Sequence, residues 1–155
     1  MITLDLTLQY VFYGGLIVLG LLILWLIKHK NRLPGHADVR KKLDLLHQNI
    51  QGFIDEKNNS GYFSFKEVTK LLYRVNKLLY QVSELAEKER DGDLGSVAIS
   101  LERVSSALSP YKFRKKDNDE ISGLINAEII LENAVALMDR IIERDKALKA
   151  RKLRG

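Results

Sequence analysis

The chain has 155 residues and a net charge of +5, from 25 Lys and Arg against 20 Asp and Glu. It contains no cysteine, which excludes disulfides, thiol catalysis, zinc–thiolate sites and iron–sulfur clusters. Only 2 prolines and 10 glycines occur, so a collagenous or proline-rich chain is excluded as well.

An uncharged run of 22 residues, 6–27, lies near the N-terminus. As a helix it is about 33 Å long, close to the thickness of a bilayer core. Tyr10, Tyr13 and Trp25 lie near its ends, where amphipathic rings prefer to sit. A buried core helix and a cleaved signal peptide are the alternatives, but no Lys or Arg precedes the run and no small-x-small site follows it. We therefore predict that residues 1–27 form an N-terminal tail and a single transmembrane helix.

The flanking charges predict the orientation of this span. Asp5 is the only charged side chain before it, whereas Lys28, Lys30 and Arg32 follow it. The positive-inside rule places the N-terminus outside and the rest of the chain in the cytoplasm, at the cell's inner (plasma) membrane. We interpret residues 28–36 as a basic juxtamembrane linker, in which Pro34-Gly35 breaks any continuation of the membrane helix.

Apolar residues beyond the linker recur at helical spacing. The pattern predicts a helix over about 37–54, a polar loop over 55–61, and a second helix from a capping box at Ser64 and Glu67 to about residue 90. A third helix follows the turn at residues 91–93 and stops at Ser109-Pro110, and after a loop a fourth is capped by Asp119. The predicted core residues are Val39, Leu43, Leu46, Ile50, Phe53, Val68, Leu71, Leu72, Val75, Leu78, Leu79, Val82, Leu85, Leu94, Val97, Leu101, Val104, Leu108, Ile121, Leu124, Ile125, Ile129, Leu131, Val135, Met138, Ile141 and Ile142.

These four amphipathic segments define the predicted fold class. We expect an all-α protein in which the transmembrane helix is followed by a cytoplasmic antiparallel four-helix bundle over 37–148 and a basic C-terminal tail over 149–155. The alternative is a dimeric coiled coil built on the second and fourth helices, and a homo-oligomer is possible in either case. The wide apolar faces favour the bundle.

The basic residues are concentrated in two segments. Residues 28–42 and 144–154 together hold 12 of the 25 Lys and Arg. An up-and-down bundle of four helices ends where it began, so both segments should face the anionic inner leaflet. The predicted contacts to anionic lipid are Lys28, Lys30, Arg32, Lys149, Arg151, Lys152 and Arg154. The alternative is a solvated tail with ordinary positive-inside flanks.

The same topology brings two loops, over residues 55–63 and 110–116, together at the end of the bundle away from the membrane. Aromatic and basic side chains are the usual anchors of protein interfaces. We therefore predict a partner-binding tip, with the alternative that its aromatic rings close the end of the core. The predicted tip residues are Tyr62, Phe63, Tyr111, Phe113, Arg114, Lys115 and Lys116.

One segment resembles a calcium-binding EF-hand loop. Glu56, Asn58, Ser60, Gly61 and Glu67 match loop positions 1, 3, 5, 6 and 12. Position 1 departs from the pattern because Asp is preferred there, and a plain polar loop is the alternative. The histidines at 29, 36 and 47 form no metal-binding motif, and we expect them to be solvated.

No motif indicates catalysis. The chain has no GxSxG, no HExxH and no glycine-rich phosphate loop, so we predict no enzyme activity, no catalytic or metal site, no cofactor and no nucleic-acid partner. The expected partners are membrane lipids and other protein subunits. We hypothesise a membrane-anchored adaptor or scaffold, a structural subunit of a larger membrane complex. The alternative is a membrane-bound immunity or sensor protein that binds one soluble partner.

Overall fold

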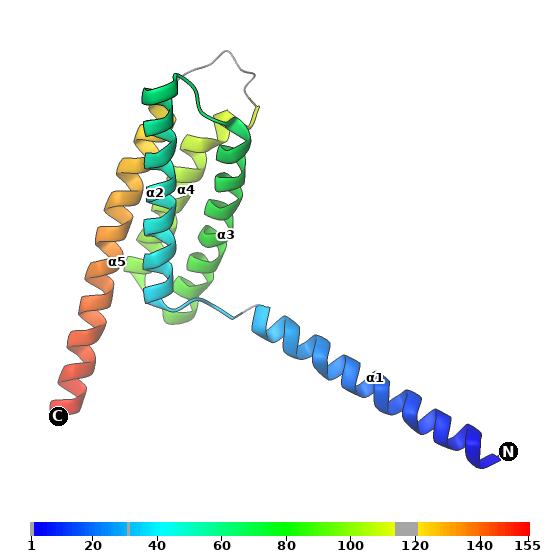
Figure 1. Ribbon diagram of the computed structural model, residues 1–155. Coiled ribbons are helices and arrows are strands. Elements are labelled where there is room, and N and C mark those ends of the chain that lie inside the picture. Colours follow the sequence, from blue (N-terminus) through cyan, green and yellow to red (C-terminus); the bar gives the residue numbers. More distant parts are fainter. Residues whose placement is uncertain (1, 31, 114–120) are drawn as a thin grey trace. The chain divides into compact units, whose positions relative to one another are not determined.

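The computed structural model describes residues 2–30, 32–113 and 121–155, and these ranges form helices without any strand (Figure 1). The helices are α1 (Ile2–Lys30), α2 (His36–Ser60), α3 (Phe65–Glu89), α4 (Gly92–Phe113) and α5 (Ser122–Arg154). The prediction of an all-helical chain with one apolar N-terminal helix is confirmed. The chain divides into two units, Met1–Leu33 and Pro34–Gly155.

The first unit is α1. Its residues Asp5–His29 have a mean hydropathy of 2.4, and the stretch is long and apolar enough to cross a membrane. Every side chain over residues 5–29 is exposed, including Leu19 and Trp25. Within its own unit the helix therefore buries none of its large apolar surface.

The second unit is a helical bundle of α2–α5 (Figure 1). Each helix packs against the next one along the chain, and α5 also packs against α2. The core lies between them, and among the described residues it contains no buried polar or charged side chain. Its members with no exposed surface are Val39, Leu43, Ile50, Val68, Val75, Val82, Leu94, Val97, Leu101, Val104, Leu108, Leu124, Ala127, Leu131 and Met138. The apolar periods of the sequence thus become the packing faces, although Ile125 and Ile129 lie exposed on α5.

The α2 helix is longer than predicted. The expected polar loop over 55–61 is wrong, because the helix continues to Ser60 and ends at Gly61. Gly61 adopts a left-handed φ of 83°, which favours glycine, and its N–H donates to the Lys57 carbonyl at 2.9 Å. Lys57 Nζ donates in turn to the Gly61 carbonyl at 2.6 Å. Polar residues alone do not end a helix, and here the glycine cap does.

The start of α3 follows the predicted capping box, and α4 starts at the predicted turn over residues 91–93. Ser64 Oγ accepts from the Glu67 N–H at 3.3 Å and begins α3, as predicted. After Arg90, which has a left-handed φ of 51°, Asp91 Oδ1 accepts from the Asp93 N–H at 2.9 Å and begins α4. These short-range signals are readable from the sequence because they depend on neighbouring residues.

The α4 helix passes through Pro110, so the predicted stop at Ser109-Pro110 is wrong. A proline inside a helix costs about 3 kcal/mol. Tyr111 is 3% exposed, and its ring packs against Phe63 and Phe65 with centroid distances of 5.5 and 6.1 Å. Burial of the Tyr111 ring contributes stability that acts against this cost.

The α5 helix extends through residues 149–154, which we expected to form a separate tail. Its predicted cap, Asp119, lies outside the described residues. The first turn of α5 approaches α4 closely at Gly123. A Cβ added there would lie 2.6 Å from the Ala107 carbonyl oxygen and 2.9 Å from the Tyr111 ring.

This close approach predicts that Gly123→Ala destabilises the bundle. The added methyl group would lie too close to backbone atoms of α4. We therefore expect the free energy of unfolding to fall by about 1–3 kcal/mol, despite the better helix propensity of alanine. Gly52 lies in α2, and a Cβ added there would have nothing within 4 Å, so Gly52→Ala serves as the matched control. The free energy of unfolding of Gly52→Ala should rise by about 0.5–1 kcal/mol, because alanine favours the helix more than glycine does. Thermal unfolding of the detergent-solubilised chain, followed by circular dichroism, measures both, and equal gains would contradict the close packing.

Candidate functional site

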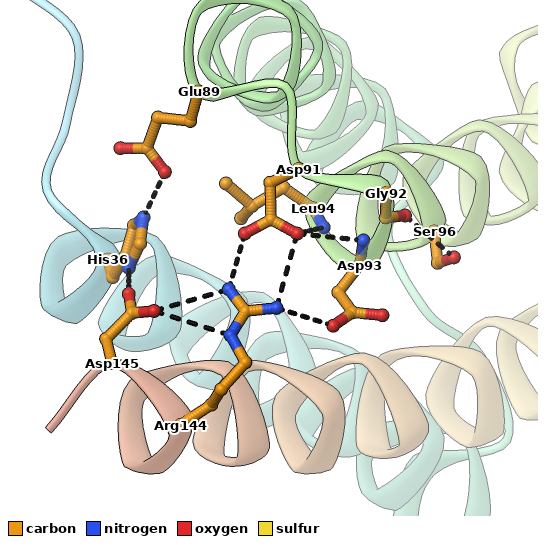
Figure 2. Close-up of polar contacts among 9 residues, drawn as sticks. All are labelled: His36, Glu89, Asp91, Gly92, Asp93, Leu94, Ser96, Arg144 and Asp145. Carbon is orange, nitrogen blue, oxygen red and sulfur yellow. Dashed lines mark hydrogen bonds and ion pairs between the residues drawn. The ribbon is translucent and has the colours of Figure 1, made fainter. Parts of the chain in front are cut away.

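A polar cluster centred on Arg144 joins several helix ends (Figure 2). Arg144 Nη2 lies 2.6 Å from Asp91 Oδ2, and Nη1 lies 2.7 Å from Asp93 Oδ2. Nη2 also lies 3.3 Å from Asp145 Oδ1 on the same helix. The guanidinium of α5 is therefore fastened to the turn that begins α4. We call Arg144, Asp91, Asp93, Asp145, His36 and Glu89 the Arg144 cluster.

His36 extends this cluster to α2. Its Nδ1 lies 2.8 Å from Asp145 Oδ2, and its Nε2 lies 2.8 Å from Glu89 Oε2 at the end of α3. The first residue of α2 is thus joined to both α3 and α5 (Figure 2). The expectation that His36 is simply solvated is wrong, because two carboxylates flank its ring.

The charges of the cluster alter two pKa values. The Arg144 guanidinium lowers the pKa of Asp91 through its hydrogen bond, and the backbone N–H groups of Asp93 and Leu94 act in the same direction against partial burial. The pKa of Arg144 is raised, chiefly by Asp91 and then by Asp145. Asp91 therefore caps the start of α4 and also forms an ion pair with Arg144 of α5.

This arrangement is that of a structural clamp. The Asp91 carboxylate is occupied by Arg144 and by the backbone of α4, and no group of three or more His, Asp or Glu in the described parts of the chain could hold a metal ion. Sequence reasoning misses the cluster, because Arg144 reads as one more residue of the basic C-terminal segment. Asp91 and Arg144 are 53 positions apart, so only the helix register pairs them.

The predicted lipid-contact residues lie in both units. Lys149, Arg151, Lys152 and Arg154 are exposed on the last turns of α5. Lys149 and Lys146 line a groove together with Gly35, His36, Ala37, Glu89, Ile142 and Asp145, so the basic turns start beside the first residues of α2. Lys28 and Arg32 are exposed in the first unit, where Lys30 ends α1.

The predicted partner-binding tip is split by the structure. Phe63 is 4% and Tyr111 3% exposed, and the two rings meet edge to face inside the bundle. Tyr62 is 64% exposed. The Phe113 side chain and Arg114, Lys115 and Lys116 lie outside the described residues. The structure therefore brings Phe63 and Tyr111 together in the core, and of the described tip residues it leaves Tyr62 on the surface.

The resemblance to an EF-hand does not survive in the structure. Glu56, Asn58 and Ser60 lie in the last turns of α2, so they do not form a loop around an ion. Ser60 Oγ donates instead to the Glu56 carbonyl at 2.7 Å. Glu67 Oε1 lies 3.1 Å from Lys70 Nζ on α3. The segment is a helix end, a short connection and a helix start.

No protein-family model, curated protein or solved structure matches this chain. Support for a function therefore comes from the geometry and the charges of the chain itself.

The Arg144 cluster predicts a stability effect. Arg144→Gln removes a partly exposed, bidentate ion pair, and we expect a loss of about 1–2 kcal/mol at neutral pH. Arg140→Gln, an exposed change one turn earlier on α5, should stay within about 0.5 kcal/mol of the wild type. Chemical unfolding of both variants provides the comparison, and equal effects would show that the cluster contributes no specific stability.

The lowered pKa of Asp91 predicts how this effect depends on pH. A carboxyl whose pKa is lowered by folding stabilises the protein above its unfolded pKa of about 4, and the contribution is lost as the pH falls through the lowered value. The difference in Tm between wild type and Arg144→Gln should therefore be constant near neutral pH. It should decrease in acid, as Asp91 becomes protonated. A difference that stays unchanged down to pH values where Asp91 is protonated would contradict the pairing.

Proposed function

We propose that this protein is a single-pass membrane adaptor, a non-catalytic structural subunit of a larger membrane protein complex. In this proposal α1 crosses the inner (plasma) membrane with its N-terminus outside. The helices α2–α5 form an antiparallel four-helix bundle in the cytoplasm and bind other protein subunits there.

The exposed apolar surface of α1 is the observation that carries the proposal. Leu16, Ile17, Leu19, Leu22 and Trp25 are each between 49% and 64% exposed. At about 25 cal/mol per Å² of apolar surface, a helix of this size is strongly unfavourable in water and favourable in a bilayer. The span Asp5–His29 also matches the length that a bilayer needs.

The antiparallel arrangement is supported by contacts between helix ends. His36, at the start of α2, contacts Glu89 at the end of α3, and Asp145 in the later part of α5 contacts the same ring. At the other end Phe63, just before α3, meets Tyr111 near the end of α4. Figure 1 likewise draws successive helices of the bundle in opposite directions.

The distribution of charge supports a contact with anionic lipid. The basic turns of α5 begin beside Gly35, which follows the end of α1 by a few residues of chain. Each Lys or Arg near an anionic leaflet contributes about 1 kcal/mol. We propose that Lys28, Lys30, Arg32, Lys149, Arg151, Lys152 and Arg154 contact lipid headgroups.

Membrane integration is tested by extraction of membranes with alkaline carbonate. An integral protein stays in the pellet because its apolar surface, and not charge, holds it there. Replacement of Leu19 and Leu22 by Arg should release the chain, whereas replacement of both by Ile should not. Full release of the wild-type chain by carbonate would overturn the proposal.

Recovery of several partners at fixed stoichiometry after mild solubilisation is expected for a complex subunit.

The lipid contact predicts a change in hydrogen exchange. In nanodiscs that contain anionic lipid, the amides of residues 146–154 should exchange more slowly than in zwitterionic nanodiscs, because the bound helix end frays less. Replacement of Lys149, Arg151, Lys152 and Arg154 by Gln should remove the difference. Equal exchange in both lipids for the wild-type chain would contradict the contact.

A further inference from the structure

The seam between α2 and α3 is the most open in the bundle. These two helices pack less closely than the other neighbouring pairs, and a groove of about 200 Å³ lies between them. Its floor contains Leu46 and Leu78, which are 4% and 2% exposed, while Leu45 is 53% exposed at its edge. Of these three leucines, only Leu45 on α2 presents much of its apolar surface to solvent.

The charged side chains that line this groove are all basic. They are Lys42 from α2 and Arg74 and Lys77 from α3, with the neutral Gln81 beside them, and among the described residues no carboxylate lines the groove. Lys42 Nζ lies 3.5 Å from Gln81 Oε1 across the seam, at the limit of a hydrogen bond. Arg74 and Lys77 are exposed and three positions apart, so they share one face of α3. The groove therefore has an apolar floor and a cationic rim.

Two large exposed side chains lie on the same helix as Arg74 and Lys77. Tyr73 and Tyr80 are 73% and 65% exposed and lie about one turn on either side of Lys77 along α3. Tyrosine and arginine are enriched in the centres of protein interfaces. Together with the groove they give α3 an outer surface suited to a protein contact.

From these features we propose that the α2–α3 groove binds an amphipathic helix with acidic flanks, supplied by a protein partner. Leucine-type side chains at i, i+3 or i+4, and i+7 of that helix fill the groove over Leu45, Leu46 and Leu78. Its Asp and Glu side chains pair with Lys42, Arg74 and Lys77. This inference rests on the proposed adaptor function and names the partner's chemistry.

The charge of the groove favours this occupant. A basic amphipathic helix would place like charges against the rim, which is unfavourable. A lipid headgroup matches the cations but leaves the side chain of Leu45 exposed, whereas an acidic amphipathic helix pairs with the cations and covers Leu45 as well. A partner helix bound here would pack as a fifth helix on the bundle, against the two neighbouring helices, α2 and α3, that pack least closely.

A defined peptide tests the groove in the intact protein. The probe is a fluorescent amphipathic peptide of about 18 residues, with Leu at helical spacing and Glu elsewhere, added to the full chain in zwitterionic nanodiscs. Fluorescence anisotropy should show saturable binding that Arg74→Glu with Lys77→Glu weakens more than about tenfold. The same peptide with Lys in place of Glu should not bind.

The matched control has the same change of charge on other helices. Arg103→Glu with Arg140→Glu alters exposed residues of α4 and α5 outside the groove, and it should leave binding within about twofold. Equal weakening by the two double variants would mean that net charge and not the groove binds the peptide. Equal binding of the Glu and Lys peptides would also overturn the proposal.

Crosslinking in the native membrane identifies the occupant. A photoreactive amino acid at Leu45 should crosslink to a partner peptide rich in Asp and Glu with apolar residues at helical spacing. The same group at Ile129, exposed on α5, should not give that product. Products with a second copy of the chain or with lipid would overturn the proposal. A chain that fails the carbonate test, yet binds the acidic peptide, would instead overturn the adaptor function alone.

Discussion

Burial of four apolar helix faces against one another is the interaction on which the bundle depends. In the described residues the buried core is entirely apolar, with leucine, valine and other aliphatic side chains from α2 to α5. Such a core supplies most of the stability but specifies helix positions only through shape, since apolar cores tolerate repacking. The ends of the bundle add the directional contacts. Arg144 and His36 fasten one end, and the rings of Phe63, Phe65 and Tyr111 fill the other.

Much of the fold is predictable from the sequence, because apolar periods and helix caps are local signals. The stripe from Val68 to Leu85 and the cap at Ser64 are found where the pattern places them. The continuation of α4 through Pro110 is not predictable in this way, and the ring cluster that buries Tyr111 joins residues that are far apart in the chain. The pairing of Arg144 with Asp91 likewise needs the register of α5 against the α3–α4 turn. The sequence contains the residues of the candidate site, but it does not show which of them form pairs.

The proposed function assigns a separate physical role to each part of the chain. In this proposal the apolar surface of α1 is the anchor and the basic turns of α5 contact lipid, while the Arg144 cluster joins the start of α2 to the rest of the bundle. The groove between α2 and α3 is then left for a protein partner.

The most direct test of the central claim is the sidedness of the chain in living cells. The protein has no cysteine, so single cysteines can be introduced and labelled with a membrane-impermeant maleimide. Thr3→Cys should react in intact cells, whereas Asn58→Cys, at the exposed end of α2, should react only after the membrane is opened. Labelling of Asn58→Cys in intact cells, or protection of both positions until the cells are opened, would contradict a single span with a cytoplasmic bundle.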